Sequence, residues 1–200
     1  GASDKPHEPA AYGTAFVDDV VRVLDHLEID RAQIVGYSMG ALIALKLLVA
    51  HPERVVSAVL GGFGWRTPGL GPPDGVIQIR AQLERAALGE ATLADIIAAS
   101  EAIDLPPPVR ASLNRNDLAA LKAVHAGDEA LLSIPETALR ANGIPILAIV
   151  GELDWARPDA ENMVEIASNA EIEVIPAATH VTALTHPLFL DAIVRFLARH

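Results

Sequence analysis

Four short runs rich in Ile, Val and Leu, separated by segments with helical spacing, constrain the fold of this chain more than any other feature. The runs cover residues 33–37, 55–60, 145–150 and 171–175. Apolar strands that alternate with helices are typical of a parallel sheet that is covered on both faces. The sequence therefore predicts an α/β fold, with a mostly parallel sheet and helices on both of its faces.

Residues 66–140 differ from the flanking chain, because they show helical patterns and no strand pattern. Proline-rich and glycine-containing breaks divide this segment into short pieces. We expect a helical insertion that forms a lid over the sheet edge, with residues 1–65 and 141–200 forming the core. The predicted helices span residues 16–27, 39–50 and 188–197 in the core and residues 76–88, 91–101, 109–124 and 128–140 in the insertion.

The composition excludes several classes of partner and site. The 200 residues include 15 Lys and Arg against 26 Asp and Glu, a net charge of −11, which argues against a nucleic-acid partner because phosphate binding depends on clustered Lys and Arg. The absence of Cys excludes disulfides and thiolate metal sites, and it fits a cytoplasmic protein. No apolar run approaches the ~20 residues that span a bilayer, and no signal peptide is visible. We therefore expect no membrane partner.

The turn between the first strand and the next helix places a serine between two glycines, as Gly36-Tyr37-Ser38-Met39-Gly40. A serine in so tight a turn has a strained backbone, and small neighbours two residues away on each side relieve the crowding. The turn would lift Oγ of Ser38 clear of the sheet and direct the N–H of Met39 to where an oxyanion forms. We interpret Ser38 as a nucleophile and Met39 as an oxyanion donor, and a plain turn with a capping serine is the alternative.

A nucleophilic serine needs a base, and the base needs a group that orients it. The third strand runs into Asp154 and the fourth runs into His180, so both residues follow strand ends in the chain order Ser, acid, His. The sequence therefore predicts a triad of Ser38, His180 and Asp154. Glu152 is the weaker candidate for the acid because it would point along the turn, and the other six His lie on helix faces, at helix boundaries or far from a strand end.

Aromatic and apolar residues at the same strand ends are candidates for a substrate pocket, because open α/β sheets bind ligands there. Plain core packing is the alternative for each of them. No spacing of His with carboxylates indicates a metal site, and no glycine-rich loop indicates a phosphate site, so no metal and no cofactor are expected. The predicted pocket residues are Tyr37, Phe63, Trp65, Trp155 and Val181.

The chain resembles the α/β-hydrolase superfamily in SDKP (3–6), VDDVVRVLDHLEI (17–29), GYSMG (36–40), HPERV (51–55), PILAIVGELD (145–154) and ATHVTALTHP (178–187). The resemblance implies that Ser38 is the nucleophile, Asp154 the acid and His180 the base, and that residues 66–140 cap the pocket. Ala41 departs mildly from the family's usual glycine. Family members carry further strands before this point, and a His-Gly loop that supplies the second oxyanion N–H. We expect both to lie outside this sequence, which would leave the first strand at an edge.

These features favour a serine hydrolase that cleaves a small carboxylic ester or a related acyl compound through an acyl-enzyme. The same triad would serve a C–C bond hydrolase, a lactonase or a cofactor-free perhydrolase, and the sequence does not distinguish them. A truncated, catalytically silent family member that acts as a binding protein is a third hypothesis. The expected partner is a small-molecule substrate. We expect the missing strands to cover the exposed sheet edge, and a second copy of the chain that covers it as a homo-oligomer is the alternative.

Overall fold

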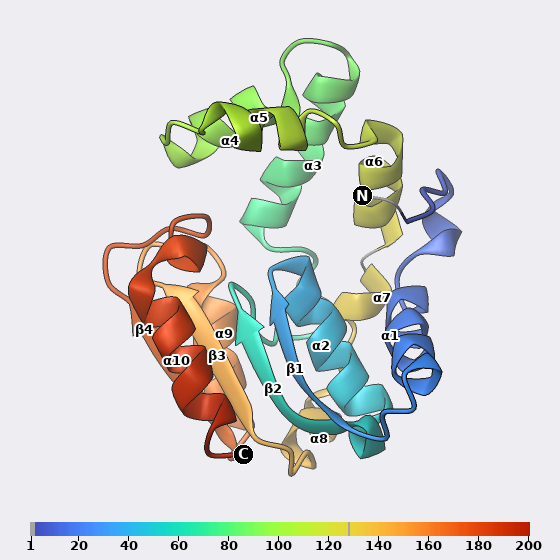
Figure 1. Ribbon diagram of the computed structural model, residues 1–200, viewed down its shortest axis with the longest axis vertical. Helices are drawn as coiled ribbons and strands as arrows, with labels where there is room; N and C mark the ends of the chain where they lie inside the picture. The colour runs from blue at the N-terminus through green and yellow to red at the C-terminus, as the bar shows by residue number, and fades with distance from the viewer. Residues whose placement is uncertain (1–2, 128) are drawn as a thin grey trace. The chain divides into compact units, whose positions relative to one another are not determined.

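A four-stranded, all-parallel sheet forms the centre of the fold in the computed structural model, which describes residues 3–127 and 129–200 (Figure 1). The strands follow one another across the sheet in chain order, so that β1 and β4 are its outer strands. This arrangement confirms the predicted α/β fold. The strands are β1 (Ala32–Tyr37), β2 (Val55–Gly61), β3 (Ile146–Gly151) and β4 (Ala170–Ile175).

Helices cover both faces of this sheet, as the sequence predicts. Helix α2 packs against β1 and β2, and α9 packs against β3 and β4. Helix α10 packs against β3 and β4 from the opposite face (Figure 1). The helices of this part of the chain are α1 (Ala15–His26), α2 (Met39–Ala50), α9 (Arg157–Ile166) and α10 (Pro187–Leu197).

The two inner strands are buried on both faces, which explains their apolar sequences. Every residue of β3 is buried, and six of the seven residues of β2 are. On the α10 face, Val59 and Ile149 pack with Phe189 and Phe196 of the helix. The strands run in parallel register, with Tyr37 beside the last residue of β2, so their C-terminal ends meet at one edge of the sheet. The loops after β1, β3 and β4 therefore leave from the same side.

Within its described residues the insertion contains helices and no strand, but two of the four predicted helices are each broken in two. The prediction of one helix over 109–124 was wrong, because Asn116 caps the C-terminal end of α5 through Leu113 O at 2.8 Å and Asp117 accepts from Ala120 N at 3.0 Å at the start of α6. The prediction of one helix over 128–140 was also wrong, because one helix ends at Leu132 and a second begins at Glu136, directly after Pro135. Residue 128, where that predicted helix begins, lies outside the described residues. The helices are α3 (Asp74–Ala87), α4 (Leu93–Glu101), α5 (Pro107–Leu113), α6 (Leu118–Gly127), α7 (Glu129–Leu132) and α8 (Glu136–Arg140).

The described chain divides into two compact units. One contains residues 3–13, 72–127 and 129, and the other contains residues 14–71 and 130–200 with the whole sheet. In the first unit, Tyr12 donates its hydroxyl to Pro6 O at 2.6 Å, and burial raises the pKa of this phenol with a smaller contribution from nearby carboxylates. All residues of the predicted triad lie in the second unit. Within the described residues, no helix is long and apolar enough to cross a bilayer.

Candidate active site

The turn between β1 and α2 holds Ser38 in a strained backbone conformation. Ser38 has φ 54° and ψ −116°, a region that L-residues rarely occupy, and its N–H donates to Gly61 O at 2.7 Å. Its carbonyl accepts from Ala41 N at 2.9 Å as the helix begins. Met39 is the first residue of α2, where a backbone N–H has no acceptor within the helix. The turn therefore presents a hydroxyl beside an N–H group that is available to a ligand.

Gly36 and Gly40 flank this turn, but only Gly36 is required by close packing. A Cβ atom on Gly36 would lie 2.1 Å from Gly40 O, whereas a Cβ atom on Gly40 would meet nothing within 4 Å. We expect Gly36→Ala to lower the free energy of unfolding by roughly 3 kcal/mol, because strand and helix must separate to admit the methyl group. Urea denaturation measures this change. The matched control Gly40→Ala keeps wild-type stability or exceeds it, and equal losses in both variants would contradict the argument.

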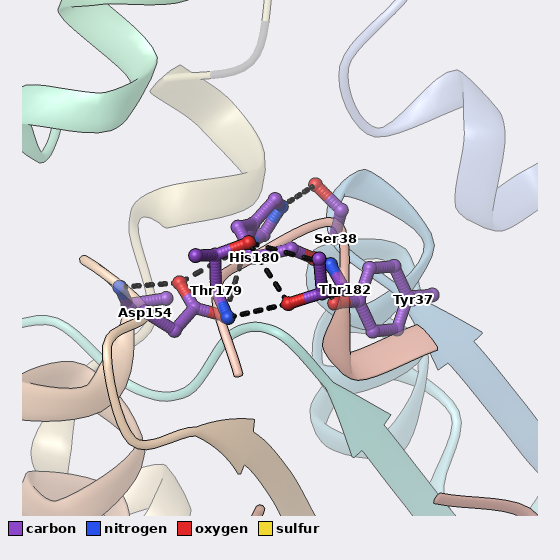
Figure 2. A network of polar contacts seen from close by, with 7 residues as sticks. Tyr37, Ser38, Asp154, Thr179, His180 and Thr182 are labelled. Carbon is purple, nitrogen blue, oxygen red and sulfur yellow. Dashed lines mark hydrogen bonds and ion pairs between the residues drawn. The ribbon is translucent and has the colours of Figure 1, made fainter. Parts of the chain in front are cut away.

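Ser38, His180 and Asp154 form one hydrogen-bonded chain (Figure 2). Nε2 of His180 lies 2.9 Å from Oγ of Ser38, and Nδ1 lies 3.0 Å from each carboxylate oxygen of Asp154. Oδ1 of Asp154 also accepts from the backbone N–H of Ala156 at 2.9 Å. Asp154 and His180 are 4% and 9% exposed, so this chain of contacts is largely shielded from water. The structure thus brings together the three side chains that the sequence predicts to act together.

This geometry fixes the direction in which a proton can move. A carboxylate can only accept hydrogen bonds, so Nδ1 of His180 carries the hydrogen that faces Asp154. The other ring nitrogen, Nε2, is then free to accept the proton of the Ser38 hydroxyl. Such an arrangement can convert a serine hydroxyl into a nucleophile when an electrophilic carbon comes within reach.

Comparison with known proteins agrees with the fold. The sequence profile of the alpha/beta hydrolase fold matches residues 1–187. The chain belongs to the α/β hydrolase family. Among curated relatives, it is 47% identical over 62 residues to 2-hydroxymuconate semialdehyde hydrolase of Pseudomonas sp. (strain CF600). That segment is 31% of this chain and 22% of the relative, so the match spans well under two thirds of the relative's length.

Solved structures share the fold of this α/β hydrolase over nearly its whole length. One structure, from work on carboxylesterases of Nitrososphaera gargenis, has a TM-score of 0.75 at 21% identity, covering 97% of this chain and 74% of that chain. A meta-cleavage product hydrolase from Pseudomonas fluorescens IP01 has a TM-score of 0.70 at 21% identity, covering 100% of this chain and 75% of that chain. At these identities the likeness concerns the fold alone.

The loops that carry Asp154 and His180 are tied to each other in the hydrolase. Glu152 accepts from Ala177 N at 2.8 Å through its carboxylate, and Leu153 N donates to Ala178 O at 2.9 Å. A Cβ atom on Gly151 would lie 2.2 Å from Ala178 O, so this close approach requires glycine. Glu152 therefore joins the two loops, and its carboxylate bonds to a backbone amide.

Two threonines on either side of His180 were not predicted as site residues. Thr179 N donates to Oγ1 of Thr182 at 2.8 Å, Thr182 N donates to Oγ1 of Thr179 at 3.3 Å, and the hydroxyls lie 3.1 Å apart (Figure 2). This reciprocal pair fixes the turn that carries the imidazole. The spacing Thr-x-x-Thr is its signal in the sequence, because threonine side chains cap nearby backbone N–H groups.

Of the five predicted pocket residues, three are partly exposed and two are buried. Tyr37 donates its hydroxyl to the carbonyl of His180. Trp155 directly follows Asp154 in the sequence and Val181 directly follows His180, and both residues are partly exposed. Phe63 is buried and packs edge-on against Trp155 with ring centroids 5.9 Å apart. Trp65 is 2% exposed and donates its indole N–H to Ile134 O at 2.8 Å, which agrees with the core-packing alternative for this residue.

One buried carboxylate of the hydrolase lies outside the chain of contacts around His180. Asp159 pairs with Arg66, whose Nη1 lies 3.1 Å from Oδ1. Burial raises the pKa of Asp159 above its ordinary value, against the opposing effect of the Arg66 guanidinium. Within residues 3–127 and 129–200, no three His, Asp or Glu side chains are grouped so as to hold a metal ion.

Proposed function

We propose that this α/β hydrolase is a serine hydrolase that cleaves small carboxylic esters or related acyl compounds. The observation that carries the proposal is the continuous contact from Asp154 through His180 to Ser38, at 3.0 Å and 2.9 Å. In this proposal Ser38 is the nucleophile, His180 is the general base and Asp154 orients the imidazole. The N–H of Met39 is one donor to the oxyanion.

The reaction proceeds in two halves. Oγ of Ser38 attacks the ester carbonyl while its proton passes to Nε2 of His180, and a tetrahedral oxyanion forms beside the N–H of Met39. His180 then returns the proton to the alcohol as the C–O bond breaks, which leaves an acyl-enzyme. Water activated by the same imidazole attacks the acyl carbon, and the acid leaves as Ser38 regains its hydrogen.

A second candidate is hydrolysis of a carbon–carbon bond next to a ketone. The 47% identity over 62 residues to a 2-hydroxymuconate semialdehyde hydrolase favours this substrate class. The same serine, histidine and carboxylate would serve either reaction, because both break a bond to a carbonyl carbon and both need a proton at the leaving group. The substrate therefore has to be identified by direct comparison of rates.

Covalent labelling and a substrate panel test the proposal together. A fluorophosphonate probe should modify the tryptic peptide 32–46, in which Ser38 is the one serine. Rates on p-nitrophenyl acetate and butyrate are then compared with rates on a 2-hydroxy-6-oxo-dienoate, followed by loss of its visible absorbance. We expect labelling of this peptide and faster turnover of the esters. Faster cleavage of the dienoate would select the second candidate, and a protein that is neither labelled nor active would overturn both.

A further inference from the structure

The imidazole of His180 lies against the indole of Trp155. The ring centroids are 4.7 Å apart and the ring planes are inclined by 31°, which is a stacked arrangement with a moderate tilt. Trp155 directly follows Asp154, so the loop after β3 supplies both the carboxylate that orients the imidazole and the ring that it rests on. A side chain predicted to line a substrate pocket is thus in direct contact with the proposed base.

Other groups hold this stacked pair in place. Phe63 is 2% exposed and meets Trp155 edge-on, with ring centroids 5.9 Å apart and planes at 79°. Tyr37 lies 5.5 Å from the imidazole centroid and donates its hydroxyl to the backbone carbonyl of His180. Aromatic rings at the C-terminal ends of β1, β2 and β3 therefore pack together with the imidazole of His180, and this packing restricts the movement of the imidazole and of the Trp155 indole.

We infer that Trp155 is a positioning residue that holds the imidazole of His180 and stabilises its positively charged form during the reaction. The inference rests on the proposed function, in which Nε2 accepts the proton of Ser38 and the ring becomes a cation. An aromatic face attracts a cation within about 6 Å of its centroid, and tryptophan does so most strongly. The stacking therefore stabilises the protonated, positively charged imidazole of His180 more than the neutral imidazole of the resting state.

Around the imidazole of His180, Asp154 supplies a negative charge and Trp155 supplies a stacked aromatic face. Asp154 faces Nδ1 from the loop after β3, and the uncharged hydroxyl of Ser38 faces Nε2 from the turn after β1. The phenol hydroxyl of Tyr37 donates to the backbone carbonyl of His180. Phe189 of α10 packs against Tyr37 and adds no charge. An opposite charge and an aromatic face thus act on the same imidazolium from one loop.

Kinetics of two variants separate positioning from substrate binding. We expect kcat for p-nitrophenyl butyrate to fall roughly tenfold in Trp155→Leu, with KM changed less than twofold, because stabilisation of the cation is lost while an apolar side chain remains at this position. Trp155→Phe should recover most of the loss, since it restores an aromatic face. The matched control Leu153→Ala lies on the same loop with a 65% exposed side chain, and it should behave as wild type.

A spectroscopic measurement tests the stacking without relying on turnover. Protons held over an indole are shifted upfield by its ring current, so the imidazole carbon-bound protons of His180 should move downfield in Trp155→Leu and partly so in Trp155→Phe. Their assignment comes from a His180→Gln variant. Unchanged shifts in Trp155→Leu, unchanged kcat in the same variant, or a raised KM with wild-type kcat would each overturn the inference. Wild-type turnover equal to that of Ser38→Ala would instead overturn the proposed function, and the shifts would still report whether the indole holds the ring.

Discussion

Ser38→Ala lowers kcat for p-nitrophenyl butyrate by at least about 10⁴-fold, which is the largest effect that we expect from any single change. The substitution removes the oxygen that lies 2.9 Å from Nε2 of His180, so no acyl-enzyme can form. Activity that remains would come from substrate binding and from the proposed oxyanion donor, the N–H of Met39, as water attacks the ester directly. The rate is measured by release of p-nitrophenolate after subtraction of the uncatalysed reaction.

Two controls make this result specific to the proposed nucleophile. Ser133→Ala is the same chemical change at an exposed position, and it should leave kcat within twofold of wild type. Thermal unfolding of Ser38→Ala should show a folded protein, because alanine is no bulkier than serine at φ 54°. A folded Ser38→Ala variant that keeps wild-type turnover would refute the role of Ser38.

Asp154→Asn lowers kcat by about 10⁴-fold while the fold is retained. Oδ1 of Asp154 accepts from Ala156 N at 2.9 Å, so an asparagine keeps its oxygen at that amide and turns its NH₂ group toward Nδ1 of His180. Nδ1 would then have to accept, and its hydrogen would move to Nε2. In that tautomer Nε2 cannot take the proton of Ser38, so the nucleophile is not activated.

The tautomer argument has its own control and its own counter-outcome. Glu165→Gln is a carboxyl-to-amide change at an exposed position of α9, and it should leave kcat unchanged. KM should change little in Asp154→Asn, because the carboxylate is 4% exposed and faces the imidazole. A loss of kcat below tenfold would mean that the imidazole is oriented by other groups.

The sheet and the central contacts of the site could be predicted because each depends on short stretches of sequence. Apolar runs predict the strands, and a residue that directly follows a parallel strand must lie at the C-terminal edge of the sheet. Ser38 directly follows β1, and Asp154 and His180 lie in the loops that leave the ends of β3 and β4, so their chain positions place them at one edge of the sheet. Their contacts in the structure agree with that expectation.

The features that were missed depend on contacts between segments that are distant in sequence or on short capping signals. The break in the predicted helix 109–124 comes from side-chain caps at Asn116 and Asp117, and helical spacing alone continues across them. The stacking of Trp155 on His180 joins two loops whose relative placement no local pattern specifies. The hydrogen bond from Trp65 to Ile134 likewise joins residues that are distant in the sequence, so no local pattern predicts it.

The sequence separations within the chain of contacts at His180 have a consequence for the order of folding. Asp154 and His180 are 26 residues apart, within one strand–helix–strand segment, whereas Ser38 and His180 are 142 residues apart with the whole helical insertion between them. Because the entropy cost of closing a loop grows with its length, the nearer pair is the easier one to form. We therefore expect Asp154 and His180 to meet early, while Ser38 joins them only when the two halves of the sheet have paired.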